Sequence, residues 1–263
     1  MRTSSSALLL IALIPLSLCA GAQQSHWVAT WGASPSPQMP DEASMRKEKL
    51  VFDNQTLREI VHTSVSGDVV RMRLSNAYGK TAADIGAAHL ALRAQASDVV
   101  PASDRALTFS GRPSVSIPPN AIVLSDPVKL NVPAGSDLAI SIFLPHAAEG
   151  AGIHYAAQQT SYIASGDASA SRSTAEATTI TSWIFLEGVD VLAPGPAATL
   201  VAFGDSITDG AHSSIDANRR WPNILADRLL ARHNASEIGV IDAGIGGNRI
   251  LHDAVTNVRF GVN

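Results

Sequence analysis

Hydrophobic and polar positions alternate in short runs over residues 26–191. The clearest runs are residues 70–74, which follow a Ser-Gly-Asp turn, and residues 138–144, which follow a Pro-Ala-Gly-Ser-Asp turn. A period of two places one face of a strand in the core and the other in water. Shorter strands are expected at residues 107–109, 115–117, 128–132 and 183–186. Many short strands separated by turns predict a β-rich fold, a sandwich of two sheets.

Two segments interrupt this pattern. Residues 165–182 are mostly Ser, Ala and Thr, which pack poorly, so we expect a mobile surface loop there. Residues 193–197 read Ala-Pro-Gly-Pro-Ala, a short and stiff connector. We therefore predict a β-sandwich domain over residues 23–192 and a linker over residues 193–198.

The pattern changes after the linker. Residues 200–203 form a continuous apolar run that predicts a buried strand, Pro222 opens a helix that runs to about His233, and residues 239–241 begin a second strand. An apolar stripe on the helix is formed by Trp221, Leu225 and Leu229, with Ile224 and Leu230 beside it. Strand, helix and strand form a βαβ unit with a parallel sheet. The fold class expected for the whole chain is therefore α+β with two domains.

The N-terminus has the pattern of a secretory signal peptide over residues 1–22. Arg2 precedes an apolar core at residues 7–18, and Ala20-Gly21-Ala22 forms a small-x-small cleavage site. A membrane anchor is the alternative, but the apolar run is well short of the roughly 20 residues that a spanning helix needs. We expect a secreted or periplasmic protein that begins near Gln23 and has no stable membrane anchor.

Composition narrows the classes of function. The chain is 46% apolar and 16% charged with a net charge of −4, which favours a globular fold and gives no sign of a nucleic-acid partner. Cys19 is the single cysteine and lies in the predicted signal peptide. The mature protein would therefore have neither disulfides nor a cysteine nucleophile.

Residues 204–210 read Gly-Asp-Ser-Ile-Thr-Asp-Gly directly after the first strand of the βαβ unit. A serine between the carboxyl end of a strand and a helix is where a hydrolase places its nucleophile, so Ser206 is the candidate. The alternative is a helix cap, in which Ser206 or Asp205 bonds free backbone amides. We assign Asp205 and Asp209 structural roles in capping and loop bonds. Gly246 and Gly247, after the second strand, could likewise form an ordinary flexible turn.

Three motifs together resemble the SGNH (GDSL-type) esterases and lipases: the Gly-Asp-Ser-Ile-Thr-Asp-Gly segment, Arg220-Trp221-Pro222, and the Asp-Ala-Gly-Ile-Gly-Gly-Asn-Arg run of residues 242–249. The likeness is to bacterial secreted members that carry a β-rich domain ahead of the hydrolase domain. It implies a flavodoxin-like α/β/α domain beginning at residue 199, with Ser206 as nucleophile. The backbone N–H groups of Ser206 and Gly247 would hold the oxyanion, and no metal or other cofactor is implied.

The chain departs from that family at two positions. Family members carry a Gly-x-Asn-Asp block that adds an oxyanion donor, and an Asp-x-x-His pair that supplies the base. Asn248 follows the glycine block and lacks the aspartate, so we do not assign it the donor role. The histidines after Ser206, to which we assign surface or capping roles, are His212, His233 and His252, the last beside Asp253. Those before the linker, His26, His62, His89, His146 and His154, carry no recognisable motif.

Length agrees with the missing motifs. Residues 199–263 suffice for one βαβ unit, whereas a doubly wound sheet needs about five strands. We expect the hydrolase domain to be incomplete in this chain and the chain alone to have little activity.

Two functions of different classes remain open. The first is a serine esterase that acts on carboxylic esters, with acetyl esters of polysaccharide as candidate substrates. The second is a carbohydrate-binding sandwich with a vestigial hydrolase tail, in which Trp27, Trp31 and Trp183 would stack on sugar rings if they are exposed rather than in the core. A third possibility is that the β-rich domain only shapes or covers the hydrolase cleft.

Overall fold

The computed structural model describes residues 25–38, 51–174, 176–193, 195–232 and 237–249. The expectations for the signal peptide and for His233, His252 and Asp253 fall outside these residues. Within the described ranges, no helix is long and apolar enough to cross a membrane.

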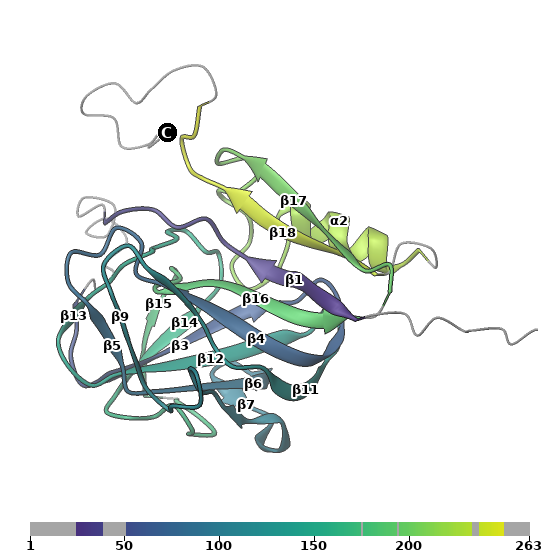
Figure 1. Cartoon of the computed structure of the whole chain (residues 1–263). Helices are drawn as coiled ribbons and strands as arrows, with labels where there is room; N and C mark the ends of the chain where they lie inside the picture. The colour runs from purple at the N-terminus through teal and green to yellow at the C-terminus, as the bar shows by residue number, and fades with distance from the viewer. Residues whose placement is uncertain (1–24, 39–50, 175, 194, 233–236, 250–263) are drawn as a thin grey trace, which may run out of the picture.

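Two antiparallel sheets face each other over the first part of the chain (Figure 1). Within the described residues, five strands form one sheet: β1 (His26–Gly32), β16 (Leu186–Ala193), β4 (Gly67–Ser75), β10 (Ile122–Leu124) and β11 (Val128–Val132). Seven form the other: β15 (Thr178–Ile180), β14 (Ser161–Ser165), β3 (Gln55–His62), β12 (Asp137–Leu144), β6 (Ala87–Gln95), β7 (Asp98–Val99) and β8 (Arg105–Ala106). Smaller pairs join β13 (Ala148–Glu149) to β2 (Val51–Phe52) and β5 (Ala83–Ile85) to β9 (Val115–Ile117), and a 3-10 turn spans Pro101–Ser103.

One continuous apolar core fills the space between the two sheets. Its members include Met72 and Val189 from the first sheet and Leu57, Leu90 and Ile140 from the second. Every second residue of β4 and of β12 points into it, because successive side chains of a strand face opposite ways. The alternation predicted a β-rich domain of this kind, and the structure confirms it.

Two of the predicted short strands are wrong in position. Residues 107–109 contribute a single bridge at Phe109, and the strand nearby is β8. Trp183 likewise makes an isolated bridge, to His154, and the strand begins only at Leu186. Both runs are buried, and burial favours apolar residues whether or not the segment pairs with a neighbouring strand. The apolar pattern therefore predicted strands where the backbone forms only isolated bridges.

The prediction of a surface loop over residues 165–182 is also wrong in part. The segment contains β15, and its carbonyl groups bind the buried guanidinium of Arg58, which donates to Ser171 O at 2.6 Å and Ala168 O at 3.2 Å. Arg58 also donates to Ser141 Oγ and to Ser97 O. Hydrogen bonds from Arg58 to its backbone therefore hold residues 168–171 of this segment on the outer face of the seven-stranded sheet.

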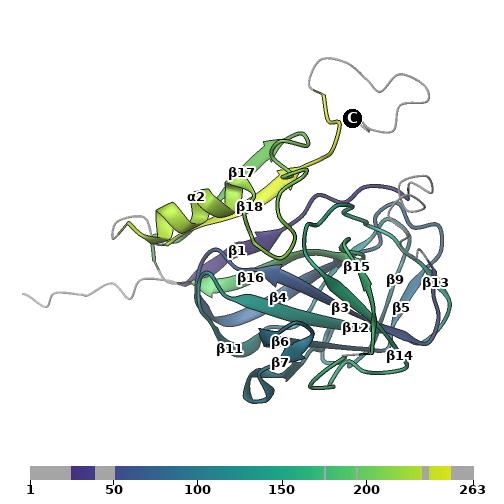
Figure 2. The ribbon, with the colours of Figure 1, turned by 180° about the vertical axis from the view of Figure 1, so that it is seen from behind.

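The rest of the described chain forms a βαβ unit. Strand β17 (Ala198–Gly204) pairs in parallel with β18 (Ile238–Gly244), and α2 (Trp221–Leu230) connects them. The unit lies against β1, at the edge of the five-stranded sheet (Figures 1 and 2). Direct bonds cross this boundary: Thr199 Oγ1 donates to Ala29 O, and Val240 N donates to Ser64 Oγ, both at 2.9 Å.

Two expectations for the βαβ unit need correction. Strand β17 is not buried, since Phe203 is 68% exposed and Val201 is 55% exposed. The apolar stripe does not form the buried face of α2, because Pro222 and Ala226 are its buried residues and Trp221 is 43% exposed. The cause is the same in both cases: within the described residues, this sheet has only two strands, so much of its apolar surface has nothing to pack against.

Candidate functional site

Ser206 lies in a turn of backbone that begins where β17 ends. The Asp205 carboxylate accepts from Ile207 N at 2.9 Å, Asp205 O accepts from Asp209 N, and Ser206 O accepts from Ala211 N. These bonds confirm the local structural role expected for Asp205. The Ser206 side chain is half-buried, and among the described residues its hydroxyl has no hydrogen-bond partner. Its hydroxyl is therefore presented by the turn rather than used to cap it.

The glycine motif lies at the same sheet edge as the serine motif. Gly204 is paired with Gly244 across the two parallel strands, and Ile245 N donates to Gly204 O at 3.0 Å. A side chain at Gly244 would overlap the backbone of Asp209, so the close approach of the two motifs requires glycine. The two motifs are far apart in the sequence, and the register of β17 and β18 places them side by side.

Gly247 adopts a φ of +77°, the left-handed region that favours glycine. Asn248 bonds backbone nearby: its Oδ1 accepts from Arg249 N at 3.0 Å, and its Nδ2 is 3.5 Å from Gly204 O. The assignment of the Ser206 and Gly247 N–H groups as oxyanion donors stays a prediction.

Asp209 does not make the local side-chain bond that we expected. Its buried carboxylate is 2.9 Å from Nε2 of His154, a buried residue of the β-rich part. His154 Nδ1 lies 2.9 Å from Ser34 O, so both ring nitrogens face oxygen acceptors. Burial disfavours the charged imidazolium, but Asp209 and these hydrogen bonds outweigh that effect, against opposition from Arg220, and raise the pKa of His154.

Arg220 supplies a second buried charge beside this pair. Its guanidinium lies over the ring of Trp183, 5.1 Å from the ring centre, and donates to Ala157 O. Asp242 lies 3.8 Å from Arg220. Burial raises the pKa of Asp242 to about 6, an effect that a backbone bond from Gly244 and the charge of Arg220 reduce. The buried groups therefore join the serine turn, α2 and β18 to the β-rich part.

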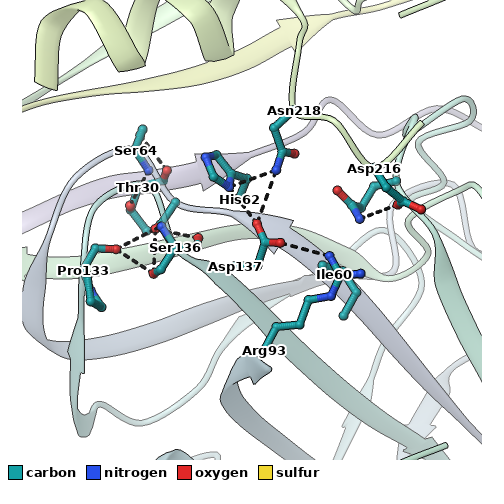
Figure 3. Close-up of polar contacts among 12 residues, drawn as sticks. Thr30, Ile60, His62, Ser64, Arg93, Pro133, Ser136, Asp137, Asp216 and Asn218 are labelled. Atoms are coloured by element: carbon teal, nitrogen blue, oxygen red, sulfur yellow. Dashed lines mark hydrogen bonds and ion pairs between the residues drawn. The ribbon is translucent and has the colours of Figure 1, made fainter. Parts of the chain in front are cut away.

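The segment between the serine turn and α2 also rests on the β-rich part (Figure 3). The Asp216 carboxylate accepts from Thr160 N at 2.7 Å and from Gln159 Nε2 at 2.6 Å. The Asn218 amide is 3.0 Å from Nδ1 of His62. His62 in turn pairs with Asp137, its neighbour across β3 and β12, at 2.7 Å.

A narrow cleft follows this boundary, with His62, Ser64, Asn218, Arg220 and Asp242 among its lining residues. It leaves only about 30 Å³ for the centres of water molecules, room for one or a few waters. Ser206 does not line it. The cleft is thus too small for an ester substrate, and it is not the candidate catalytic site.

Among the described residues, no histidine is placed to act as the base for Ser206. His212 is exposed at a positive φ of 66°, and among the described residues no histidine bonds Ser206. In the β-rich part, His26 bonds Ala197 O, and His89 pairs with Asp104. Sequence reasoning missed the role of His154, because its partner Asp209 is 55 positions away in the chain and no motif marks His154 itself.

The tryptophans do not form the sugar-stacking surface considered above. Trp31 and Trp183 are 7% and 4% exposed and pack edge to face, with ring centres 4.8 Å apart. Trp183 also donates from Nε1 to Ile60 O. Trp27 is half-buried, and the Arg71 guanidinium lies 4.2 Å from its ring centre. These rings instead pack in the core, against Arg71, and at the boundary with the βαβ unit, where Trp183 lies under Arg220.

Comparison with known proteins gives one family. A search of curated proteins found no match to the chain. Residues 200–260, which contain both the serine motif and the glycine motif, match the family model of the GDSL-like lipases/acylhydrolases, and this match supports a hydrolase of that family in this part of the chain.

Proposed function

We propose that the chain is part of a secreted serine esterase of the SGNH (GDSL) type that hydrolyses carboxylic ester bonds. The observation that carries the proposal is the pairing of Gly204 with Gly244, which sets the serine and glycine motifs side by side at the carboxyl edge of a parallel sheet. Ligands of open α/β sheets bind at this edge. The GDSL-like match over residues 200–260 supports the same reaction class.

In the proposed reaction, Ser206 Oγ attacks the ester carbonyl carbon and loses its proton to a base. The carbonyl oxygen becomes an oxyanion that accepts hydrogen bonds from the N–H groups of Ser206 and Gly247. Collapse expels the alcohol, which takes up the proton, and leaves an acyl group on Ser206. Water then attacks the acyl group, releases the acid and restores the serine.

The base is proposed to be a histidine outside the described residues. A hydroxyl without a base reacts slowly, so we expect the chain alone to turn over esters poorly. The proposed division is a β-sandwich domain at residues 23–192, a linker at 193–198 and an SGNH hydrolase domain from residue 199. Acetyl esters of polysaccharide are the proposed substrates, and no metal takes part.

The test supplies a base from solution. The chain from Gln23 onward is incubated with 4-nitrophenyl acetate and imidazole, and acetylated peptides are mapped by mass spectrometry. The proposal expects the peptide containing Ser206 to gain one acetyl group. This gain should vanish in Ser206→Ala and persist in the matched control Ser214→Ala, which alters an exposed serine a few residues away.

Two results would change the account. Acetylation that is unaffected by Ser206→Ala would contradict the esterase assignment. Steady turnover without imidazole, lost in Ser206→Ala, would support the esterase but contradict the expected lack of a base.

A further inference from the structure

The buried Asp209 carboxylate belongs to the serine turn, yet it points away from the proposed reaction and into the β-rich part. Its side chain is 8% exposed, and that of His154 is 5% exposed. Both therefore lie where water is excluded. A buried charge of this kind is costly unless it is paired, so the pair must form whenever the two parts are packed together.

The geometry around His154 fixes its proton state. A neutral imidazole has one donor and one acceptor nitrogen, but both nitrogens here face acceptors, the Ser34 carbonyl and the Asp209 carboxylate. The imidazolium satisfies both. His154 is thus a cation with two fixed donors, one toward its own domain and one toward the serine turn.

The ring of Trp183 packs against His154. The ring of Trp183 lies 5.5 Å from the imidazole ring at an angle of 33°. The Arg220 guanidinium also lies over Trp183. The imidazole is therefore packed as well as bonded, which limits its rotation.

Asp209 is bound at its backbone as well as at its side chain. Its N–H donates to Asp205 O, one residue before Ser206, and its backbone packs against Gly244 on β18. A change in the position of the Asp209 carboxylate should therefore also move the backbone of the serine turn and its contact with Gly244.

We infer that His154 is a positioning residue for Ser206, through which the β-rich domain holds the serine turn against β18. The effect of His154 on the reaction of Ser206 rests on the proposed function. The restraint of the serine turn by His154 rests on the contacts alone. The β-rich domain then contributes to the reaction without touching substrate.

The first test measures the turn directly. Hydrogen–deuterium exchange is followed at the amides of Asp209 and Ala211 in the whole chain, in His154→Gln and in His154→Phe. Exchange at both amides should speed up, more in the phenylalanine variant, because glutamine keeps one donor. The matched control is His89→Gln, which removes a histidine–aspartate pair of similar length, 2.9 Å, far from the turn in the sequence. Peptides from β12 report whether each variant is folded.

Unchanged exchange at the turn in His154→Gln, with β12 still protected, would overturn the inference whatever the chain does with esters. The second readout is the rate of imidazole-assisted acetylation of Ser206. It should fall roughly 10- to 100-fold in His154→Gln, as expected when a reacting group is misplaced by about 1 Å, and stay unchanged in His89→Gln.

The two readouts separate the two proposals. Suppose that exchange is faster in the His154 variants but Ser206 is not acetylated even in the unaltered chain. This result would support restraint of the turn by His154 and reject the esterase. Normal acetylation in His154→Gln, alongside an unaltered chain that acetylates, would reject positioning of Ser206 by His154.

Discussion

Gly204 and Gly244 occupy paired positions at the carboxyl ends of β17 and β18, and Ile245 next to Gly244 donates its N–H to the Gly204 carbonyl at 3.0 Å. A Cβ at either position would overlap the serine turn, at the Thr208 side chain for Gly204 and at the Asp209 backbone for Gly244. The pairing aligns the serine turn with the glycine turn at one sheet edge, and the proposed chemistry depends on that alignment.

Replacement of Gly244 by alanine should therefore loosen the site. The added methyl group would overlap the Asp209 backbone, and overpacking of this kind costs about 1–3 kcal/mol. We expect a loss of that size in the free energy of urea unfolding. The control is Gly32→Ala in β1, where the new methyl group would meet Ile241 at an ordinary contact distance of 3.4 Å. An equal loss in both variants would contradict the proposed overlap.

Gly247→Ala tests the second turn. Gly247 has a φ of +77°, and an L-residue pays about 1–2 kcal/mol to adopt it. The turn should then change conformation, which moves the N–H group of residue 247 away from the position proposed for the oxyanion. Imidazole-assisted acetylation of Ser206 should therefore slow at least tenfold. Gly111→Ala is the matched control, because Gly111 has the same φ of +77° but lies in the β-rich part. A similar slowing in both variants would indicate a general effect on stability.

The core of the β-rich part contains an acid whose titration should limit stability. Glu59 is fully buried, and burial raises its pKa well above 4.5 despite a hydrogen bond from Ile184 N. Because the folded pKa is raised, its favourable contribution is complete below about pH 4.5 and is lost as pH rises through the folded pKa.

Glu59→Gln removes this titration. Urea unfolding at about pH 5 and about pH 8 should therefore show the variant gaining stability relative to the unaltered chain as pH rises. Glu149→Gln, at an exposed position of β13, is the control and should show no such gain. A stability difference between Glu59→Gln and the unaltered chain that does not change with pH would rule out titration of Glu59.

The exposed apolar face of β17 should promote self-association. Val201 and Phe203 lie on one face of the strand, with 55% and 68% of their surface exposed, and Ile207 follows at 77%. Within the described residues β17 pairs with β18 alone, and contiguous apolar surface beside an unpaired strand edge favours contacts between chains. Sedimentation velocity should show association that grows with concentration and decreases in Val201→Thr/Phe203→Ser. Val51→Thr, at another exposed valine, should not reduce it. A chain that stays monomeric at high concentration would contradict this expectation.

The sequence predicted what depends on local pattern. Alternation placed β4 and β12, and Pro222 placed the start of α2 to within one residue, because a proline is tolerated in the first helical turn but not later. The glycine pair after the second strand was one candidate for a turn, and Gly246 and Gly247 do lie in one, with Gly247 at a positive φ.

Contacts between distant residues were beyond local pattern. His154 and Asp209 belong to different parts of the chain, and nothing in the neighbourhood of either residue marks the other. Arg58 likewise carries no sign in the local sequence of its role, although it binds the backbone of residues more than a hundred positions away. The stripe on α2 misled because a helix buries its apolar face only where a sheet is wide enough to cover it.

The central claim is that Ser206 carries the acyl group while its own N–H and that of Gly247 hold the oxyanion. A crystal structure of the chain after reaction with a phosphonate ester tests both parts, because the bound tetrahedral phosphorus stands in for the ester carbon at the transition state. The account predicts phosphorus bonded to Ser206 Oγ, with one phosphoryl oxygen accepting hydrogen bonds from both N–H groups. Phosphorus on another residue, or a phosphoryl oxygen that faces away from Gly247, would contradict it.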